Sequence, residues 1–256
     1  MIHSTAIVSD KAIIADDVEI GPYSIIGDGV EIGSGTRIDS HVVINGPTII
    51  GKDNHIYQFA SIGDDPQDKK YANEPTRLVI GDRNTIREFC TFSRGTSQDR
   101  GETTIGSDNW VMSYVHIAHD CVVGDKTIMA NNTTLAGHVH LGDWVICGGF
   151  SGVHQFCKIG AHAFLGMYSA VNRDIPAYTT VSGQPATARG INSEGLKRRD
   201  FSPEQIRNIK NAYRITFRQG KKKEEAIEEI AALVDAQPEL EPFLESLRSS
   251  ERGLAR

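Results

Sequence analysis

The sequence lacks the features of several protein classes. It has no apolar run of about 18 residues, the length that a membrane-spanning helix needs, so we expect no transmembrane segment. Its first residues show no basic region followed by an apolar core, so we expect no signal peptide. The net charge of −6 argues against a nucleic-acid partner. The four cysteines form no CxxC pair, and a chain of 256 residues needs no disulfide framework. We therefore expect a reduced, cytoplasmic protein.

A large apolar residue returns at every sixth position through most of the chain. This series, whose members we call repeat residues, occupies 2–62 and 80–92, and restarts one place out of phase for 105–171. Among its members only Cys147 is not large and apolar. The residue two places before a repeat residue is mostly small. Alternate residues of a strand share a face, so each large and small pair points inward, and the second and third positions after a repeat residue form a corner.

Three strands at this six-residue spacing close a triangular coil of 18 residues, and successive coils stack about 4.8 Å apart. The pattern resembles the hexapeptide-repeat, left-handed parallel β-helix. The handedness rests on this resemblance, because right-handed crossovers are otherwise the rule. A β-sandwich, the alternative, does not keep one spacing over so many strands. The predicted fold is therefore mainly β, with a left-handed parallel β-helix over 1–188 and a small α-helical domain over 189–256.

Two segments, 63–79 and 93–104, interrupt the repeat. We expect both to be loops that project from the prism. Loops of this kind are often functional, and the alternative is that they are tolerated insertions.

Helical spacing replaces the six-residue repeat near the C-terminus. Ser202, Pro203 and Gln205 form a capping-box signature that starts a helix, and Gly220 ends it. We expect further helices at 222–235 and at about 240–249. The first helix carries one basic stripe, made of Arg207, Lys210, Arg214, Arg218 and Lys221. Such a stripe is either a solvated face or a docking surface for an acidic protein or a phosphorylated ligand.

Three corner residues lie one coil apart: His119, Gly137 and Gln155. The same angular position therefore holds an imidazole, a glycine whose N–H can be exposed, and a carboxamide, with His138 and His154 beside them. At a corner Asp120 can accept a hydrogen bond from the ring of His119 and fix its tautomer. This arrangement favours a general base, whereas a lone histidine would be a surface corner residue.

A metal site is the competing interpretation of these histidines. A γ-type carbonic anhydrase uses the same prism with zinc held by three histidines at a subunit interface. Here His116 lies on a strand face while His119 lies at a corner, so the two side chains diverge. We therefore expect no metal and no cofactor.

Several outward positions in the later coils are apolar: Trp144, Ile146, Phe150, Phe156, Phe164, Met167 and Tyr168. We expect them near the histidine edge. Exposed apolar strips mark interfaces or ligand grooves, and a prism with one apolar edge packs about a threefold axis. The groove between subunits of a homotrimer can then hold both the histidines and an acyl chain.

The motifs "HVVINGPTIIGKDNHIYQFASIG", "VHIAHDC", "NNTTLAGHV", "VHQFCKIGAH", "NSEGLKRR" and the final "RGLAR" extend over the whole chain. In these motifs the sequence resembles the UDP-N-acetylglucosamine acyltransferase family of lipid A biosynthesis. The resemblance implies transfer of an R-3-hydroxyacyl group from acyl carrier protein to the glucosamine 3-hydroxyl of UDP-N-acetylglucosamine. His119 would be the general base held by Asp120, and the N–H of Gly137 would bind the oxyanion.

The resemblance also assigns binding residues. Asp68 and Lys70 would contact the sugar nucleotide, and His116, His138 and Gln155 would line the site. The uridine diphosphate end would be held from a neighbouring subunit by Asn192, Glu194, Arg198 and Arg199. The basic helix would meet the acidic carrier protein.

Two residues depart from the family pattern. Ser93 stands where "HRGT" carries a histidine, which puts that contact in doubt. Met167 stands where the family measures acyl length, and its bulk predicts a donor of about ten carbons. The alternatives are a related UDP-sugar N-acyltransferase, a coenzyme A-dependent hexapeptide acetyltransferase and a non-enzymatic trimeric scaffold.

Overall fold

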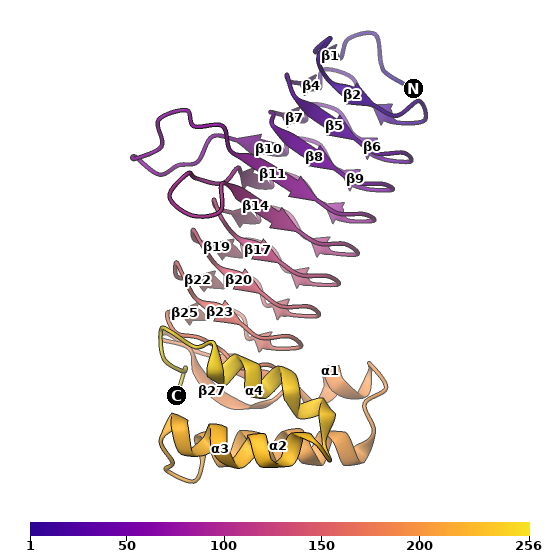
Figure 1. Ribbon diagram of the computed structural model, residues 1–256. Coiled ribbons are helices and arrows are strands. Elements are labelled where there is room, and N and C mark those ends of the chain that lie inside the picture. The colour runs from indigo at the N-terminus through magenta and orange to yellow at the C-terminus, as the bar shows by residue number, and fades with distance from the viewer.

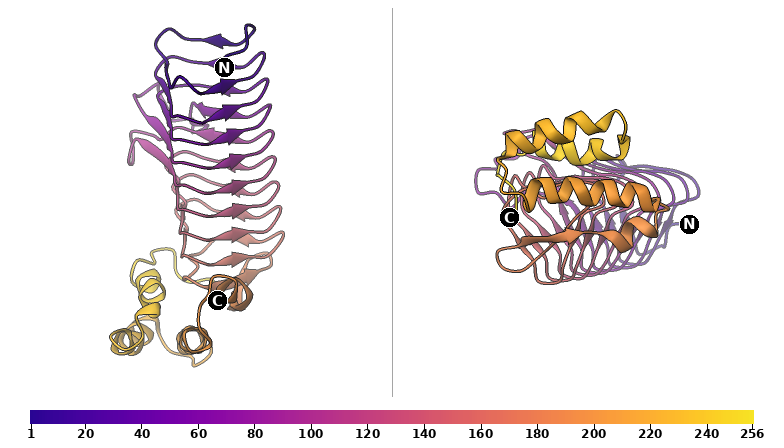
Figure 2. Two further views of the ribbon diagram at one scale, coloured as in Figure 1. Left: turned by 90° about the vertical axis from the view of Figure 1, so that its right-hand side faces the viewer. Right: turned by 90° about the horizontal axis from the view of Figure 1, so that it is seen from below.

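The computed structural model describes residues 1–256 as a three-sided prism of stacked coils with helices packed at its C-terminal end (Figure 1). Three parallel sheets form the sides, and each coil contributes one short strand to each sheet, as the side and end views of Figure 2 show. Parallel register joins residues one coil apart, for example Ile117 with Leu135 and Leu135 with Val153. This is the predicted left-handed parallel β-helix followed by a helical segment.

The strands are two to five residues long because each side of the prism is short. Sheet 1 contains β1 Ile7–Val8, β4 Ile25–Ile26, β7 Val43–Ile44, β10 Ser61–Asp64, β13 Thr91–Ser93, β16 His116–Ile117, β19 Thr134–Leu135, β22 Gly152–Val153 and β25 Ala170–Val171. Sheet 2 contains β2 Ile13–Ile14, β5 Val30–Ile32, β8 Thr48–Ile50, β11 Arg77–Ile80, β14 Glu102–Ile105, β17 Val122–Val123, β20 His140–Leu141 and β23 Lys158–Ile159. Sheet 3 contains β3 Glu19–Ile20, β6 Arg37–Ile38, β9 His55–Ile56, β12 Thr85–Ile86, β15 Trp110–Val111, β18 Ile128–Met129, β21 Ile146–Cys147, β24 Phe164–Leu165, β26 Thr179–Ser182 and β27 Thr187–Ile191.

The interior of the prism is a column of repeat residues and of the small residues two places before them. Ile117 and Leu135 are fully buried, as are Val115 and Thr133. The column opens at the N-terminal end, where Ile2 is half exposed because no earlier coil covers it. Burial of this continuous apolar column is what holds coil on coil.

Most corners turn through a residue with a positive φ, three places after the repeat residue. The left-handed conformation recurs at Asp120, His138 and Phe156 with φ values of 58°, 63° and 65°. These three residues stack along the edge between sheets 1 and 2, which we call edge 1–2. The corresponding edges after sheets 2 and 3 are edge 2–3 and edge 3–1.

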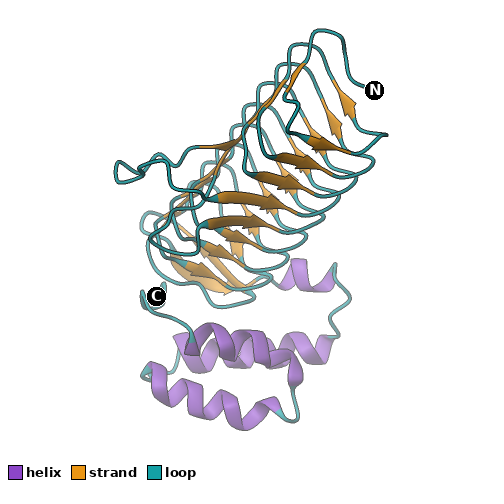
Figure 3. Cartoon of the chain, turned by 45° about the horizontal axis from the view of Figure 1, so that its top comes forward, coloured by secondary structure: helices purple, strands orange, loops and turns teal.

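Both interrupting loops leave the prism at edge 1–2, as Figures 1 and 3 show. One joins β10 to β11 through residues 65–76, and the other joins β13 to β14 through 94–101. Both loops are shorter than predicted because the flanking strands extend into them. Arg94 connects the two loops, since its guanidinium donates to the carbonyl of Gly63 at 2.6 Å and to the hydroxyl of Tyr71 at 3.1 Å.

The C-terminal helices are α1 Ser193–Lys197, α2 Pro203–Phe217, α3 Lys223–Val234, the 3₁₀ turn η1 Pro238–Leu240 and α4 Glu241–Arg248. The predicted capping box of α2 is present between Ser202 and Gln205. The sequence patterns missed α1 and β27, and β27 spans the predicted boundary at residue 188 by pairing antiparallel with β26. None of the helices has both the length and the apolar character required to cross a membrane.

Candidate active site

His119 and Asp120 form a hydrogen-bonded pair at the corner that follows β16. Nδ1 of His119 lies 2.9 Å from Oδ2 of Asp120, and the imidazole is 14% exposed. The positive φ of Asp120 turns its side chain back toward the preceding ring, which an extended strand would not allow. A proton on Nδ1 donated to the carboxylate leaves Nε2 of His119 free to act as a base.

Asp120 is completely buried and is held by the second loop. Its carboxylate accepts the backbone N–H of Thr96 at 2.9 Å and the Thr96 hydroxyl at 2.6 Å. Burial alone raises the pKa of the Asp120 carboxyl, but the hydrogen bonds from His119 and Thr96 outweigh it, so the pKa lies below its ordinary value. Asp120 therefore stays ionised beside the imidazole at neutral pH.

Gly137 lies directly against the ring of His119. A Cβ at this position would lie 2.6 Å from Cε1 and 2.7 Å from Nε2 of His119. The backbone N–H of Gly137 donates no hydrogen bond within the chain, as is also true of the corner amides of His119 and Gln155. A bare amide next to a free imidazole nitrogen is an arrangement that can stabilise a negatively charged oxygen.

His138 adds a second imidazole to the same edge. Its ring meets the ring of His119 edge-on at 5.0 Å and stacks on Phe156 at 4.3 Å. Its Nδ1 lies 2.7 Å from Oδ2 of Asp99 in the second loop. The patterns in the sequence identified His138 but gave no signal for Asp99 or Thr96.

These residues line a hollow of about 520 Å³ at edge 1–2. Its walls are Gln67, Asp68, Lys70, Ser93, Gln98, His116, Ala118, His119, Ala136, Gly137, His138, Gln155 and Phe156. The structure thus brings together the predicted catalytic corner and the predicted residues of the first loop. The catalytic corner residues lie together because the register between coils stacks residues that are 18 apart. The residues of the first loop join them because that loop leaves the prism at the same edge.

His116 lines the hollow but belongs to a different hydrogen-bond network. Its Nδ1 lies 2.7 Å from the hydroxyl of Thr91, and burial lowers its pKa. The only cluster of possible metal ligands is His119, Asp120 and His138, whose ligand atoms lie within 4.8 Å of one another. Because Asp120 already accepts hydrogen bonds from His119 and Thr96, and His138 is bonded to Asp99, these atoms form a hydrogen-bonded network in the chain.

The segment "NSEGLKRR" lies away from this hollow, at edge 2–3. Asn192 caps α1 through the N–H of Gly195 and donates to the carbonyl of His162. Arg199 lies 3.0 Å from Nδ1 of His162 and its guanidinium covers Trp144 at 4.9 Å. Glu194 pairs with its neighbour Lys197, and Arg198 is exposed. Within one chain two of these residues therefore contact His162, but none reaches His119 or His138.

The basic stripe is shorter than predicted. Arg207, Lys210 and Arg214 are exposed on α2, and Arg218 caps its C-terminus. Lys221 lies beyond the helix, which ends at Phe217 rather than at Gly220, and its ammonium pairs with Glu229 of α3. Lys221 is therefore not part of the stripe.

The apolar residues expected near the histidine edge are spread over the prism. Only Phe156 lies at edge 1–2. Trp144 lies at edge 2–3, Ile146 pairs with Phe164 on the face of sheet 3, and Phe150, Met167 and Tyr168 lie at edge 3–1. The prediction of one apolar edge was wrong because residues six apart, such as Trp144, Phe150 and Phe156, occupy successive corners of the triangle, and only residues 18 apart share an edge.

A second hollow, of about 520 Å³, lies on the outer face of sheet 1 between edges 1–2 and 3–1. It is lined by Thr134, Gly152, Val153, His154, Ala170, Val171, Asn172 and Pro185. Strand β22 leads from it into Gln155 of the first hollow, and Met167 precedes strand β25 at its other side. Small side chains make this face a shallow groove, and a Cβ on Gly152 would meet no atom within 4 Å.

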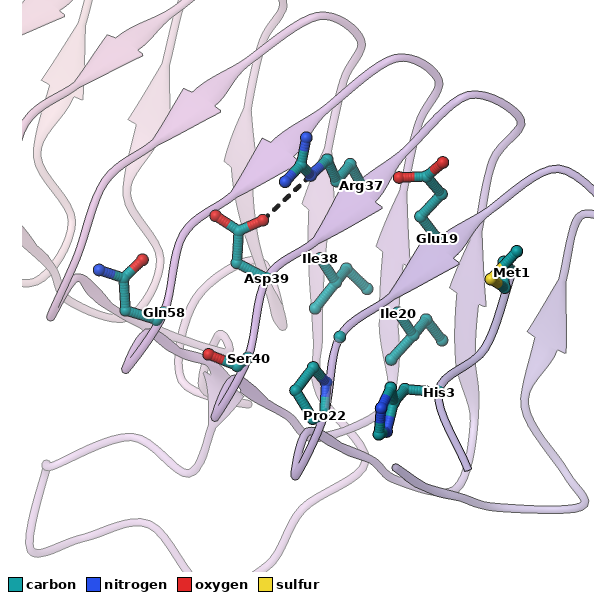
Figure 4. A pocket seen from close by; sticks show the side chains of 11 residues that line it. Met1, His3, Glu19, Ile20, Pro22, Arg37, Ile38, Asp39, Ser40 and Gln58 are labelled. Carbon is teal, nitrogen blue, oxygen red and sulfur yellow. Dashed lines mark hydrogen bonds and ion pairs between the residues drawn. The ribbon is translucent and has the colours of Figure 1, made fainter. Parts of the chain in front are cut away.

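A third hollow, of about 470 Å³, lies on sheet 3 in the first coils (Figure 4). Met1, Glu19 and Arg37 are among its lining residues. Arg37 is paired with Asp39 at 3.1 Å, and Asp39 also bonds His55. Arg37 and Asp39 are thus paired within the chain, and none of the predicted site residues lines this hollow.

Family profiles and full-length relatives both match the sequence of this chain. The family profile described as Udp N-acetylglucosamine O-acyltransferase, Domain 2, matches residues 174–255, and that of the bacterial transferase hexapeptide matches 11–46 and 102–137. Acyl-(acyl-carrier-protein)–UDP-N-acetylglucosamine O-acyltransferases from Thiobacillus denitrificans and Stutzerimonas stutzeri are 57% and 55% identical, over 100% of this chain and 99% of each relative.

Solved structures agree with these sequence matches. The UDP-N-acetylglucosamine O-acyltransferase of Moraxella catarrhalis is 51% identical and superposes with a TM-score of 0.99, covering 100% of this chain and 99% of that one. The enzyme of Francisella novicida is 45% identical with a TM-score of 0.98, covering 100% of this chain and 94% of that one. With a full-length match in both sequence and structure, the chain belongs to the UDP-N-acetylglucosamine O-acyltransferase family.

Proposed function

We propose that the protein transfers an R-3-hydroxyacyl group from acyl carrier protein to the 3-hydroxyl of UDP-N-acetylglucosamine. The observation that carries this proposal is the pairing of His119 with Asp120 directly against the free N–H of Gly137. Transfer of an acyl group to an alcohol needs a base for the hydroxyl proton and a donor for the oxyanion. Family membership supports the same substrates.

His119 is the base in this proposal. Nε2 takes the proton of the sugar hydroxyl, and the oxygen attacks the thioester carbonyl carbon to form a new C–O bond. The carbonyl electrons move to the oxygen, which accepts the N–H of Gly137. When the C–S bond breaks, the thiolate receives the proton from Nε2, and Asp120 stabilises the imidazolium while it carries that proton.

The cysteine thiols do not fit an acyl-enzyme pathway. All four are buried, and burial raises the pKa of Cys121 and of Cys147 to about 12. A thiol that stays protonated and inaccessible cannot serve as a nucleophile. This supports direct attack of the sugar hydroxyl on the thioester. Four unpaired thiols also fit the reducing cytoplasm, where we place the protein.

The first loop supplies the proposed contacts to the sugar nucleotide. Asp68 and Lys70 line the hollow together with His116 and Gln155. A lysine ammonium and a carboxylate there suit a ligand that carries both phosphates and sugar hydroxyls. Ser93 is buried at the same wall and leaves more room than an imidazole would.

The remaining contacts are proposed to come from a neighbouring subunit of a homotrimer. Asn192, Glu194, Arg198 and Arg199 lie at edge 2–3 and cannot meet His119 of their own chain. Exposed aromatic side chains along edge 3–1, including Phe150 and Tyr168, give the prism an apolar strip of the kind that interfaces bury. A trimer would place edge 1–2 of one subunit against its neighbour.

The groove on sheet 1 is the proposed path of the acyl chain. It begins beside Gln155 and passes small residues toward Met167, a residue that is 62% exposed. The basic residues of α2 remain the proposed contact for the acidic carrier protein. Lys221 lies outside α2 and is paired with Glu229, so it no longer belongs to this proposed contact.

Mass spectrometry of the reaction product tests the proposal. Purified protein is incubated with UDP-N-acetylglucosamine and a series of 3-hydroxyacyl carrier proteins, and we expect an ester at the 3-hydroxyl. His119→Ala should lower kcat by at least about a hundredfold, the loss typical of a removed general base. Acylation only of a 3-amino sugar nucleotide, or only from coenzyme A thioesters, would refute the proposed substrates. Unchanged activity of His119→Ala would refute the proposed base.

A further inference from the structure

The 94–101 loop reaches the catalytic edge at a second point besides Thr96. Oδ2 of Asp99 lies 2.7 Å from Nδ1 of His138, 39 residues later in the chain. The ring of His138 is then fixed on three sides, by Asp99, by the face of Phe156 at 4.3 Å and by the edge of His119 at 5.0 Å. The imidazole of His138 is only 14% exposed.

The contact between Asp99 and His138 adds little to the stability of the fold. Its side chain is 37% exposed, and ion pairs with an exposed partner stabilise a fold very little. The loop has other anchors that do not involve His138, namely Thr96 on Asp120, Arg94 on Gly63 and Ser97 on Glu74. The fold of the loop therefore does not depend on the Asp99 carboxylate.

The orientation has a chemical consequence. When Nδ1 of His138 donates its proton to Asp99, Nε2 is the one ring nitrogen left to meet a ligand. His138 follows Gly137 in the chain and lines the same hollow as His119. A ring that turned about its Cα–Cβ bond would remove Nε2 from the neighbourhood of the reacting groups.

We infer that Asp99 is a positioning residue that fixes the tautomer and the ring orientation of His138 and so keeps Nε2 of His138 at the acyl-transfer site. The expected effect on turnover rests on the proposed function, whereas the expected effect on the tautomer and orientation of His138 does not. It makes the 94–101 loop part of the catalytic apparatus at two points, Asp120 through Thr96 and His138 through Asp99.

Substitution of Asp99 in the full-length protein tests the inference. Asp99→Ala should lower kcat about tenfold to a hundredfold and leave the KM for UDP-N-acetylglucosamine within about twofold, because the substrate still binds but a group is misplaced. Asp99→Glu should restore activity to within about threefold of wild type, because the longer carboxylate in a loop can still accept from Nδ1. Ser97→Ala, which removes only the contact to Glu74, is the matched control and should behave as wild type.

Nitrogen NMR of histidine-labelled protein gives a readout that is independent of turnover. The Nδ1–H tautomer of His138, assigned by its absence in His138→Gln, should predominate in wild type and lose its preference in Asp99→Ala. An unchanged tautomer in Asp99→Ala, or an equal loss of kcat in Ser97→Ala, would overturn the inference. A wild-type protein that shows the tautomer but makes no product would refute the proposed function and leave the positioning of His138 in place.

Discussion

The space around the imidazole of His119 depends on one missing side chain. Gly137 has no Cβ, and an added one would lie 2.6 Å from Cε1 of His119, well inside the contact distance of two carbon atoms. The neighbouring backbone is held by the coil register, because the N–H of His138 donates to the carbonyl of His119 at 3.0 Å. The ring is therefore the part that must move.

Gly137→Ala is expected to lower kcat about a hundredfold while the protein stays folded. The methyl group displaces the ring from Asp120 and covers the amide that binds the oxyanion, and shifts of about 1 Å have effects of this size. Steady-state kinetics and thermal unfolding measure the two effects. Gly190→Ala is the matched control, since a Cβ on Gly190 would meet nothing within 4 Å. Full activity of Gly137→Ala would show that this corner does not contact the reacting atoms.

At the residue scale, the six-residue period predicted which corner residues of the prism lie together, but it could not place the residues of the projecting loops. The 18-residue coil places His119, Gly137 and Gln155 in one hollow, as the sequence pattern predicted. Thr96 and Asp99 belong to a loop without a repeat, so no spacing indicated that they would reach Asp120 and His138. The catalytic role of each residue stays a prediction.

At the scale of elements, His162 joins the prism to the helical segment. It lies at edge 2–3 against Tyr178, and its Nδ1 lies 3.0 Å from Nη1 of Arg199, just beyond α1. Burial, with a smaller contribution from the charge of Arg199, lowers the pKa of His162 from 6.5 to about 4. The folded protein therefore keeps this ring neutral where the unfolded chain would protonate it.

This depressed pKa predicts a pH dependence of stability. Below pH 6.5 His162 becomes protonated in the unfolded chain, whereas in the folded protein it stays neutral down to about pH 4. The free energy of unfolding therefore falls as the pH drops from 6.5 to about 4. The contribution is fully present above pH 6.5 and is at most about 3 kcal/mol. Urea unfolding at pH 7.5 and 5 should show a smaller difference for His162→Phe than for wild type.

An exposed histidine provides the control for this measurement. His154→Phe changes a ring that is exposed on the groove of sheet 1, so it should keep the wild-type pH dependence. Equal pH dependence of His162→Phe and wild type would show that other groups account for the acid sensitivity.

Sequence patterns predicted elements as far as a local signal marked them. The six-residue repeat predicted the strands, and the capping box predicted the start of α2. Strand β27 pairs antiparallel at the end of sheet 3, where no further coil imposes the period, and α1 has only five residues, so neither left a usable pattern. The predicted basic stripe included Lys221 because the helical spacing of basic residues continues in the sequence after α2 has ended at Phe217.

At the scale of the whole molecule, the proposed site residues lie on two different edges, so the proposed site needs residues from two subunits. His119 lies at edge 1–2, whereas the helix α1 that precedes Arg198 packs at edge 2–3. The sequence showed the two motifs but not their separation, because distance around the prism depends on which side each strand occupies.

Mixing two inactive variants tests this assembly. The His119→Ala protein and the Arg198→Ala protein should each lose most activity. When the two proteins are unfolded together and refolded into mixed trimers, up to about a quarter of the wild-type rate should return. That fraction follows because one ordered pair of subunits in four carries an intact His119 and an intact Arg198 at random mixing. Failure to regain activity, in mixed trimers confirmed by mass, would place both residues in the same chain's site or remove Arg198 from the site.

We expect the length of the groove on sheet 1 to set the preferred acyl donor. Met167 lies at the corner before β25, beyond the residues that line the groove, and in this proposal its flexible side chain takes up space that a longer acyl chain would need. Wild type should therefore prefer a 3-hydroxyacyl group of about ten carbons, since each added methylene that finds no room weakens binding by about 1–3 kcal/mol.

Met167→Gly removes that obstacle and should shift the preference toward about fourteen carbons in kcat/KM, measured with competing carrier-protein thioesters. Met167→Leu keeps a side chain of similar volume and should keep the wild-type preference. A wild type that already prefers the long donor, with Met167→Gly leaving that preference unchanged, would show that the acyl chain does not pass this corner.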